Sequence, residues 1–345
     1  MLTANEELLF NAISSRAGDI ASIIESNHIN VNCQNKDGWT LIHIAAQNGY
    51  VELINLLVNK GGDVNTPNND GITPLSIAVS KGHIDVINLL ARNRADLNKA
   101  NNKGRTPIVI AAVYGHIEVI NLLIEKGVDV NTPDKDGWTL LHIAAKKCDL
   151  ELIKLLAGNG ADVNKKDKWG QTAIRIAAQN GHAEVINLLV EKGANVNTPD
   201  EDGITPILIA AQNGHLDIIN LLAAKEANVN MPDKDGWTLI HIAAKKGDLG
   251  LINLLAENRS DFNKKDKWGQ TAVFIAVDNG HIDVINLLIE KGADVNTANN
   301  DGWTPLLIAA KKGYVDVINL LIENGVDVNA ANNDGATAVS VAASN

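Results

Sequence analysis

Apolar residues in this chain fall into pairs of short segments, shown well by residues 70–102. The apolar positions there are Leu75, Ile77, Ala78 and Val79, then Ile84, Val86, Ile87, Leu89 and Leu90. Their i, i+3, i+4 spacing is typical of helices with one apolar face. Thr73 suits an N-cap, Pro74 the first helical position and Gly82 a left-handed C-cap. The pattern predicts a helix from Pro74 to about Lys81, a reversal at His83 and a second helix. Helices of this length are unstable alone, so we expect them to pack on neighbours.

The same pattern recurs every 33 residues, marked by a Gly-x-Thr element. The ten glycines that begin it are Gly38, Gly71, Gly104, Gly137, Gly170, Gly203, Gly236, Gly269, Gly302 and Gly335. A strict period of this size predicts a stack of repeats, without a closed globular core. A stack has no central pocket, so its function must lie on its surface.

The repeat motif resembles a known family. Gly-x-Thr-Pro-Leu-x-x-Ala-Ala, Gly-His, Ile/Val-Asn-Leu-Leu and Gly-Ala-Asp-Val-Asn follow one another, with close matches at 38–46 and 292–296. This is similar to the ankyrin repeat, over roughly residues 5–345. The resemblance implies an all-α repeat solenoid, in which each repeat has two antiparallel helices and a β-hairpin finger and the repeats form a curved superhelix. It also implies a concave groove lined by fingers and first helices.

The period divides the chain into three parts. We expect an N-terminal capping repeat over 1–37, nine full ankyrin repeats over 38–334, and an incomplete repeat over 335–345 that supplies only a first helix. An uncapped stack exposes apolar surface. We therefore expect either that the natural chain continues or that this end frays.

Some repeats depart from the pattern at helix ends. Arg94, Glu226 and Arg259 stand where other repeats have the glycine that closes the second helix, and Cys148 replaces a first-helix glycine. A left-handed conformation is disfavoured for such residues. These positions are expected to be softer joints.

Bulk composition narrows the class of protein. The net charge of −11 argues against a nucleic-acid partner. No basic and apolar leader and no long apolar run is present, which predicts no membrane insertion. Cys33 and Cys148 lie too far apart in a stack to pair, which favours free thiols and a cytoplasmic location. Heavy use of Asn, Ile and Lys is compatible with a host-associated organism, whose effector would act in a host cytoplasm.

The candidate binding residues are aromatic and basic. All six tryptophans stand at the junction of finger and helix: Trp39, Trp138, Trp169, Trp237, Trp268 and Trp303. The last two positions of the first helix vary between repeats. Three repeats have a lysine pair there: Lys146 and Lys147, Lys245 and Lys246, and Lys311 and Lys312. In another repeat, Tyr114 occupies the second of the two positions. Tryptophan is enriched at binding hot spots, and lysine would attract an acidic partner. The alternatives are indoles packed on neighbouring fingers, and lysines solvated near helix C-termini.

A longer period overlies the first. Residues 134–202 and 233–301 are close copies 99 residues apart. Tandem duplication explains this directly; presentation of one surface patch more than once is the functional alternative.

Catalysis is not expected. Eight of the nine histidines occupy two repeat positions, and no zinc-protease, Cys-x-x-Cys or phosphate-loop motif occurs. We predict no enzyme activity, no cofactor and no metal. Hairpin asparagines such as Asn131 and Asn296 resemble sites of asparaginyl hydroxylation in ankyrin proteins, although asparagine is also an ordinary turn residue.

The function predicted from these observations is a non-catalytic scaffold that binds a protein or peptide, acidic for preference, along the groove. We expect a monomer. The alternative is an ankyrin segment of a larger chain that serves as a spacer or assembly surface.

Overall fold

The computed structural model describes residues 2–15, 20, 23–24, 29–258 and 260–344. Contacts divide the chain into two units, Met1–Lys168 and Trp169–Asn345. In unit 1 the helices are α1 (Ala4–Ser15), α3 (Leu41–Asn48), α4 (Val51–Asn59), α5 (Pro74–Lys81), α6 (Ile84–Arg92), α7 (Pro107–Tyr114), α8 (Ile117–Glu125), α9 (Leu140–Lys147) and α10 (Leu150–Gly158). The pair α5 and α6 confirms the helix bounds predicted for residues 70–102.

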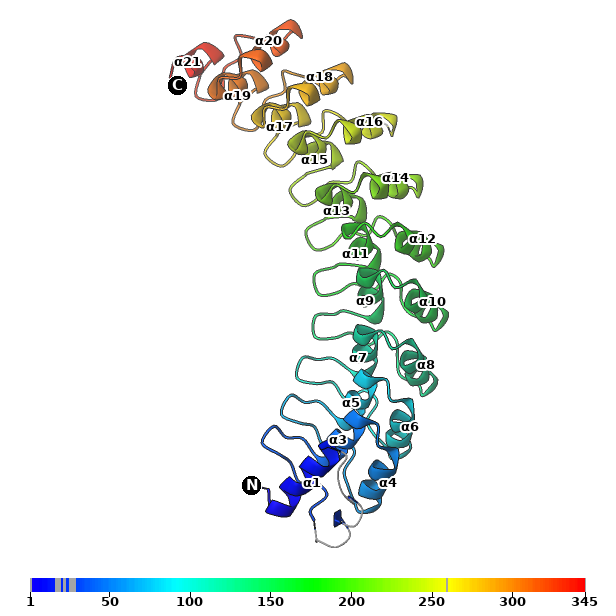
Figure 1. The fold of residues 1–345 in the computed structure, drawn as a ribbon. Coiled ribbons are helices and arrows are strands. Elements are labelled where there is room, and N and C mark those ends of the chain that lie inside the picture. Colours follow the sequence, from blue (N-terminus) through cyan, green and yellow to red (C-terminus); the bar gives the residue numbers. More distant parts are fainter. Residues whose placement is uncertain (1, 16–19, 21–22, 25–28, 259, 345) are drawn as a thin grey trace. The chain divides into compact units, whose positions relative to one another are not determined.

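Unit 2 continues the same alternation (Figure 1). Its helices are α11 (Ala173–Gln179), α12 (Ala183–Glu191), α13 (Pro206–Asn213), α14 (Leu216–Ala224), α15 (Leu239–Lys246), α16 (Leu249–Glu257), α17 (Ala272–Asp278), α18 (Ile282–Glu290), α19 (Pro305–Lys312), α20 (Val315–Glu323) and α21 (Ala338–Ala343). The last of these, α21, takes the first-helix place and contacts α19.

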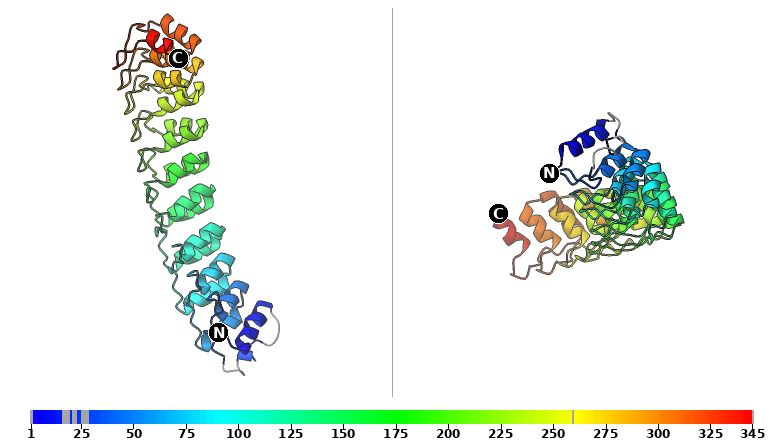
Figure 2. Two further views of the ribbon diagram at one scale, coloured as in Figure 1. Left: turned by 90° about the vertical axis from the view of Figure 1, so that its left-hand side faces the viewer. Right: turned by 90° about the horizontal axis from the view of Figure 1, so that it is seen from below.

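Each unit is built from two layers of stacked helices (Figure 1), and the finger loops lie along one side (Figure 2). First helices contact first helices, as α3 does α5 and α11 does α13, and second helices likewise contact one another. A first helix lies between two neighbours and is buried almost all round: in α7, every residue from Pro107 to Ala112 is buried. Second helices bury one face only, for example Val86, Ile87 and Leu90 in α6. Within each unit, the apolar core therefore lies between the stacked helices, as expected for repeats that pack on their neighbours.

Local signals set the helix ends. The Thr73 hydroxyl accepts a hydrogen bond from the Ser76 amide at 3.3 Å, Pro74 follows, and Gly82 closes α5 at φ 72°. Arg94, Cys148 and Glu226 have φ values of 65°, 58° and 64°, which confirms that they occupy left-handed caps. Arg259, the remaining predicted joint, lies outside the described residues.

The fingers differ in detail from the hairpin that the resemblance implied. The Asn35 side chain accepts hydrogen bonds from the Asp37 and Trp39 amides at 3.0 and 2.9 Å, which closes each finger as a tight turn. Over the described part of the chain no strand forms, and an isolated bridge joins Ala331 to Thr337. Neighbouring fingers are tied edge to edge instead, as where the Asn69 amide donates to the Asp37 carbonyl at 3.1 Å.

The asparagine near the end of several repeats makes hydrogen bonds to the next repeat. Asn131 donates to the Gly160 carbonyl at 3.1 Å and accepts from the Asp162 amide at 2.8 Å. Asn296 makes the same two bonds to Gly325 and Asp327. These bonds join successive repeats, and they account for the asparagine without any modification. The division of the chain at residues 37 and 334 stays a prediction.

Candidate functional site

Four tryptophans follow the finger glycine, and the turn fixes their backbone. The amides of Trp138 and Trp237 donate to the Asp134 and Asp233 carboxylates at 2.9 and 2.8 Å. All four indoles, those of Trp39, Trp138, Trp237 and Trp303, are half-buried. Each therefore offers one part to its neighbours and another to solvent, so packing and contact are compatible roles.

Buried histidines support three of these indoles. The ring centroids of Trp39 and His43 lie 5.5 Å apart, those of Trp138 and His142 5.9 Å, and those of Trp237 and His241 6.0 Å. The histidines lie in the first helices, where they are almost fully buried. The three indoles therefore pack against buried imidazole rings.

The His43 ring is locked by two backbone groups. The Thr40 amide donates to Nδ1 at 3.0 Å, so the Nε2 proton lies toward the Ile72 carbonyl at 2.9 Å. Burial lowers the pKa of His43 to about 4, although the Ile72 carbonyl acts in the opposite direction. Burial likewise lowers the pKa of His241. Neutral rings held in this way are structural, and they are poorly placed to transfer protons to a substrate.

Trp169 and Trp268 precede the finger glycine and are more exposed, at 44 and 45 %. The Trp268 amide donates to the Asp266 carboxylate at 2.9 Å, and the Lys267 ammonium lies 4.4 Å from the centre of the Trp268 ring. The same lysine forms an ion pair with Asp235 of the preceding finger. Trp268 is thus held in place while much of its indole remains accessible.

The two lysines of each predicted pair do different work. The first lies over the tryptophan eight residues before it: Lys146 is 5.4 Å from the Trp138 ring, Lys245 5.2 Å from Trp237, and Lys311 4.9 Å from Trp303. The second binds the preceding repeat. Lys147 donates to the Ala112 carbonyl at 3.1 Å, Lys246 to the Gln212 carbonyl at 2.7 Å, and Lys312 pairs with Asp278 at 3.1 Å. The first lysine of each pair therefore lies at an indole, whereas the second links its repeat to the preceding one.

In unit 2, these residues surround a hollow of about 580 Å³. Its lining includes Trp237, Trp268, Lys245, Lys246, Asp233 and Asp235. This volume lies within the range of ordinary ligand sites, roughly 300–1,000 Å³. The structure thus brings two predicted tryptophans and one predicted lysine pair together.

Comparison with family models assigns almost the whole chain. Models described as "Ankyrin repeats (3 copies)" match residues 9–101, 89–167, 141–233 and 225–299, and "Ankyrin repeats (many copies)" matches 288–342. The chain is an ankyrin repeat protein. Ankyrin repeats are generally protein–protein interaction modules and are typically non-catalytic. No curated protein matches the sequence.

Two negative findings accompany this ankyrin assignment, both limited to the residues that the structure describes. None of their helices has the length and apolar character needed to cross a membrane. No group of three or more of their His, Cys, Asp and Glu side chains is arranged to hold a metal ion.

Tyr114 lies apart from the tryptophans on the ankyrin stack. It is 62 % exposed, and its ring stacks on His116 with centroids 6.2 Å apart. It lines a separate hollow of about 340 Å³ in unit 1, together with Arg105, Ile77 and Ser80. Among the predicted site residues, Tyr114 therefore belongs to a different part of the surface.

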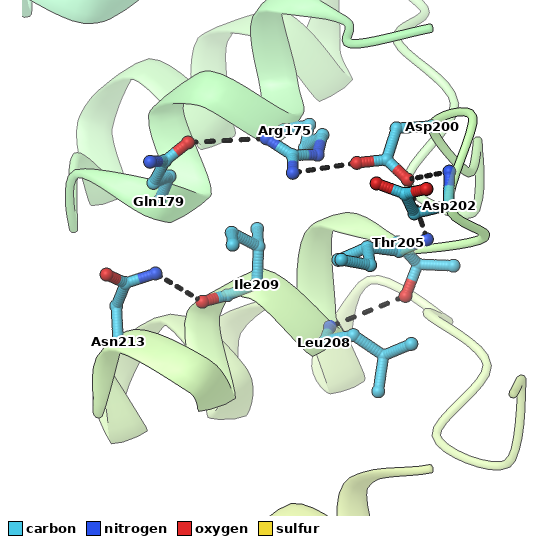
Figure 3. Close-up of polar contacts among 9 residues, drawn as sticks. Arg175, Gln179, Asp200, Asp202, Thr205, Leu208, Ile209 and Asn213 are labelled. Atoms are coloured by element: carbon cyan, nitrogen blue, oxygen red, sulfur yellow. Dashed lines mark hydrogen bonds and ion pairs between the residues drawn. The ribbon is translucent and has the colours of Figure 1, made fainter. Parts of the chain in front are cut away.

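Sequence reasoning missed a buried ion pair in the ankyrin core. Arg175 on α11 pairs with Asp200 of the next finger at 2.7 Å, and their side chains are 6 and 4 % exposed (Figure 3). Asp200 also accepts from the Asp202 and Ile204 amides, and Arg175 contacts Gln179 at 3.3 Å. The signal for this pair was a charged residue at the buried third position after a repeat threonine, where other repeats have His, Ser, Val, Leu or Phe.

Proposed function

We propose that this ankyrin protein is a non-catalytic scaffold that binds a partner protein or peptide along its fingers and first helices. The hollow between Trp237 and Trp268 carries the proposal, because it joins accessible indole surface to ammonium groups at fixed positions. Aromatic residues of this kind are typical anchors at interfaces. Because the surface is preorganised by the stack, little side-chain entropy is lost on binding.

The partner that fits this surface best is acidic. Lysines at the ends of α9, α15 and α19 would steer it and define its register. The setting that we propose is the cytoplasm, or a host cytoplasm if the protein is a delivered effector, with the scaffold acting as a monomer. The unpaired cysteines Cys33 and Cys148 are compatible with a reducing compartment.

Paired tryptophan substitutions test this function. A partner captured by affinity purification and identified by mass spectrometry should bind Trp138→Ala/Trp237→Ala at least ~30-fold more weakly, as expected when hot-spot residues are lost. Helical circular dichroism should change little. The control is Val315→Ala, which removes a 65 % exposed side chain at the start of α20. Unchanged affinity of the double variant would contradict the proposal, and loss of the helical signal would assign the indoles to packing.

A further inference from the structure

The hollow in unit 2 combines an apolar slot with a local positive charge. Trp237 and Trp268 lie on consecutive fingers, and Ile242 of α15, which is 4 % exposed, also belongs to the lining. Both indoles have an ammonium group over one ring, those of Lys245 and Lys267. An aliphatic or aromatic side chain of a ligand could contact the accessible part of these indoles, of which Trp268 is 45 % exposed.

The acidic groups at the hollow are already engaged by the protein itself. Asp235 is paired with Lys267, and the Asp233 carboxylate accepts hydrogen bonds from the Asp235 and Trp237 amides at 2.9 and 2.8 Å. Lys246 uses one of its donors on the Gln212 carbonyl, and Lys245 is held over an indole. Counting Lys267 beside the hollow, three lysines stand against the two carboxylates of its lining, so the net local charge is positive and its complement is a carboxylate.

Six of the residues that line this hollow recur 99 positions earlier, in unit 1. Asp134, Asp136, Trp138, Ile143, Lys146 and Lys147 are identical to their counterparts around the hollow. Their geometry is also the same: the lysine–indole distances are 5.4 and 5.2 Å, and the indole–histidine distances 5.9 and 6.0 Å. In each copy the second lysine donates to the first helix of the preceding repeat.

Trp303 does not repeat the full arrangement. It has its lysine, Lys311, but Asn299 replaces the aspartate of the turn, and Asp334 stands at the position equivalent to Trp268. Its second lysine is paired with Asp278. The ammonium group of this second lysine is thus already neutralised by a carboxylate, and we expect two equivalent sites in the chain and no third.

We propose that the Trp237 hollow and the Trp138 region bind the same ligand, a short acidic segment with one apolar side chain, so that a partner with two such segments binds both. This inference rests on the proposed function and adds the ligand class and the stoichiometry. The apolar side chain contacts the indole, and the flanking carboxylates meet Lys245 and Lys246 in one copy and Lys146 and Lys147 in the other. A tandem partner gains affinity because its second segment binds intramolecularly.

Synthetic peptides test the stoichiometry with the intact chain. The probe is acetyl-Asp-Asp-Leu-Asp-Asp-amide, and the charge-reversed acetyl-Lys-Lys-Leu-Lys-Lys-amide is its control. Isothermal titration should give two equivalent sites for the acidic peptide and no binding for the basic one. Two copies joined by a Gly/Ser linker of suitable length should bind with a stoichiometry of one and at least ~100-fold more tightly, as expected for bivalent attachment. A stoichiometry of one for the single peptide, or equal binding of both charges, would overturn the inference.

Single variants assign the two sites. Lys245→Met and Lys146→Met keep the fold, because both side chains are exposed, and each should lower the stoichiometry from two to one. Each should also remove the tandem advantage, whereas Val315→Ala should change neither. If the peptide fails to bind while the captured partner still requires Trp237, the inference is wrong and the proposed function stands. If the partner is indifferent to both tryptophans, the proposed function itself is wrong.

Discussion

At the scale of single residues, the glycine of the finger is present in all ten Gly-x-Thr elements, whereas the glycine that closes the second helix is replaced in some repeats. The surroundings of the two glycines explain this difference. A Cβ atom at the finger glycine Gly71 would lie 2.8 Å from the Asn102 backbone nitrogen, so only glycine fits between stacked fingers. At Gly61 and Gly127, which close second helices, a Cβ atom would meet nothing within 4 Å. The glycine that closes the second helix requires only a positive φ, which Arg94 and Glu226 adopt at a cost in backbone energy.

This difference predicts opposite changes in the free energy of unfolding for substitutions at Gly71 and Arg94. Arg94→Gly should raise the free energy of unfolding by about 1 kcal/mol, because it relieves the left-handed strain. Gly71→Ala should lower it by considerably more, because a steric clash is added to the strain. Urea denaturation followed by circular dichroism measures both. Gly127→Ala is the matched control and should cost only about 1 kcal/mol; equal losses for Gly71→Ala and Gly127→Ala would refute the steric argument.

At the scale of elements, the Arg175–Asp200 pair fixes α11 against the following finger from inside the core. Such a pair is expensive to desolvate, and removal of one partner leaves the other charge buried. The chain also contains an uncharged version of this pair. At an offset of 99 residues, Phe274 and Asn299 occupy the positions of Arg175 and Asp200.

A double-mutant cycle therefore has a natural template. Asp200→Asn alone should destabilise the protein by about 3–5 kcal/mol, because Arg175 loses its partner while the turn bonds, which Asn35 also makes, are kept. Arg175→Phe/Asp200→Asn should recover most of that loss, since it recreates the Phe274–Asn299 pair. Thermal or urea unfolding of the four species gives the coupling energy. If the double variant is no more stable than Asp200→Asn, the ion pair is not the source of the loss.

The elements also show what sequence alone could and could not establish. The bounds of α5 were predictable because Thr73, Pro74 and Gly82 act within one helix. The bond from Lys147 to the Ala112 carbonyl and the Arg175–Asp200 pair connect residues 35 and 25 apart. The repeat indicates which positions face a neighbour, but not which partner a charged side chain selects there. The tryptophans were placed correctly at the finger junctions, whereas the lysines over their rings follow from a Trp-to-Lys spacing of eight that became meaningful only in three dimensions.

At the scale of the whole molecule, the buried neutral histidines link stability to pH. The pKa of His43 falls from 6.5 in the unfolded chain to about 4 in the folded protein, so the unfolded chain binds more protons between these values. The contribution of the neutral His43 ring to the free energy of unfolding is therefore fully present above about pH 6.5. It declines as the pH falls toward 4, by about 3 kcal/mol in all. The lowered pKa of His241 acts in the same direction.

Urea unfolding at a series of pH values checks this dependence. The free energy of unfolding should fall between pH 6.5 and 5, before most carboxylates titrate. His43→Leu provides the control, because Leu208 and Leu307 fill the equivalent position in other repeats. In this variant, the free energy of unfolding should fall less steeply with decreasing pH, because the contribution of His43 is absent. A parallel pH profile in the two proteins, or a His43 ring that titrates near 6.5 by NMR, would contradict the assignment of the decline to this residue.

Stability along a stack is a sum of repeat and interface terms, so weak repeats should be visible as local opening. Residues 216–258 carry two penalties: Glu226 closes α14 at φ 64°, and Gly250 lies inside α16. Residues 282–326 carry neither, because Gly292 and Gly325 close α18 and α20. Each penalty is about 1 kcal/mol.

Amides of α14 and α16 should therefore exchange with solvent several-fold faster than those of α18, as measured by hydrogen–deuterium exchange. Glu226→Gly should slow exchange in α14 and leave α18 unchanged, whereas equal protection of α14, α16 and α18 would show that neighbouring interfaces outweigh these local penalties.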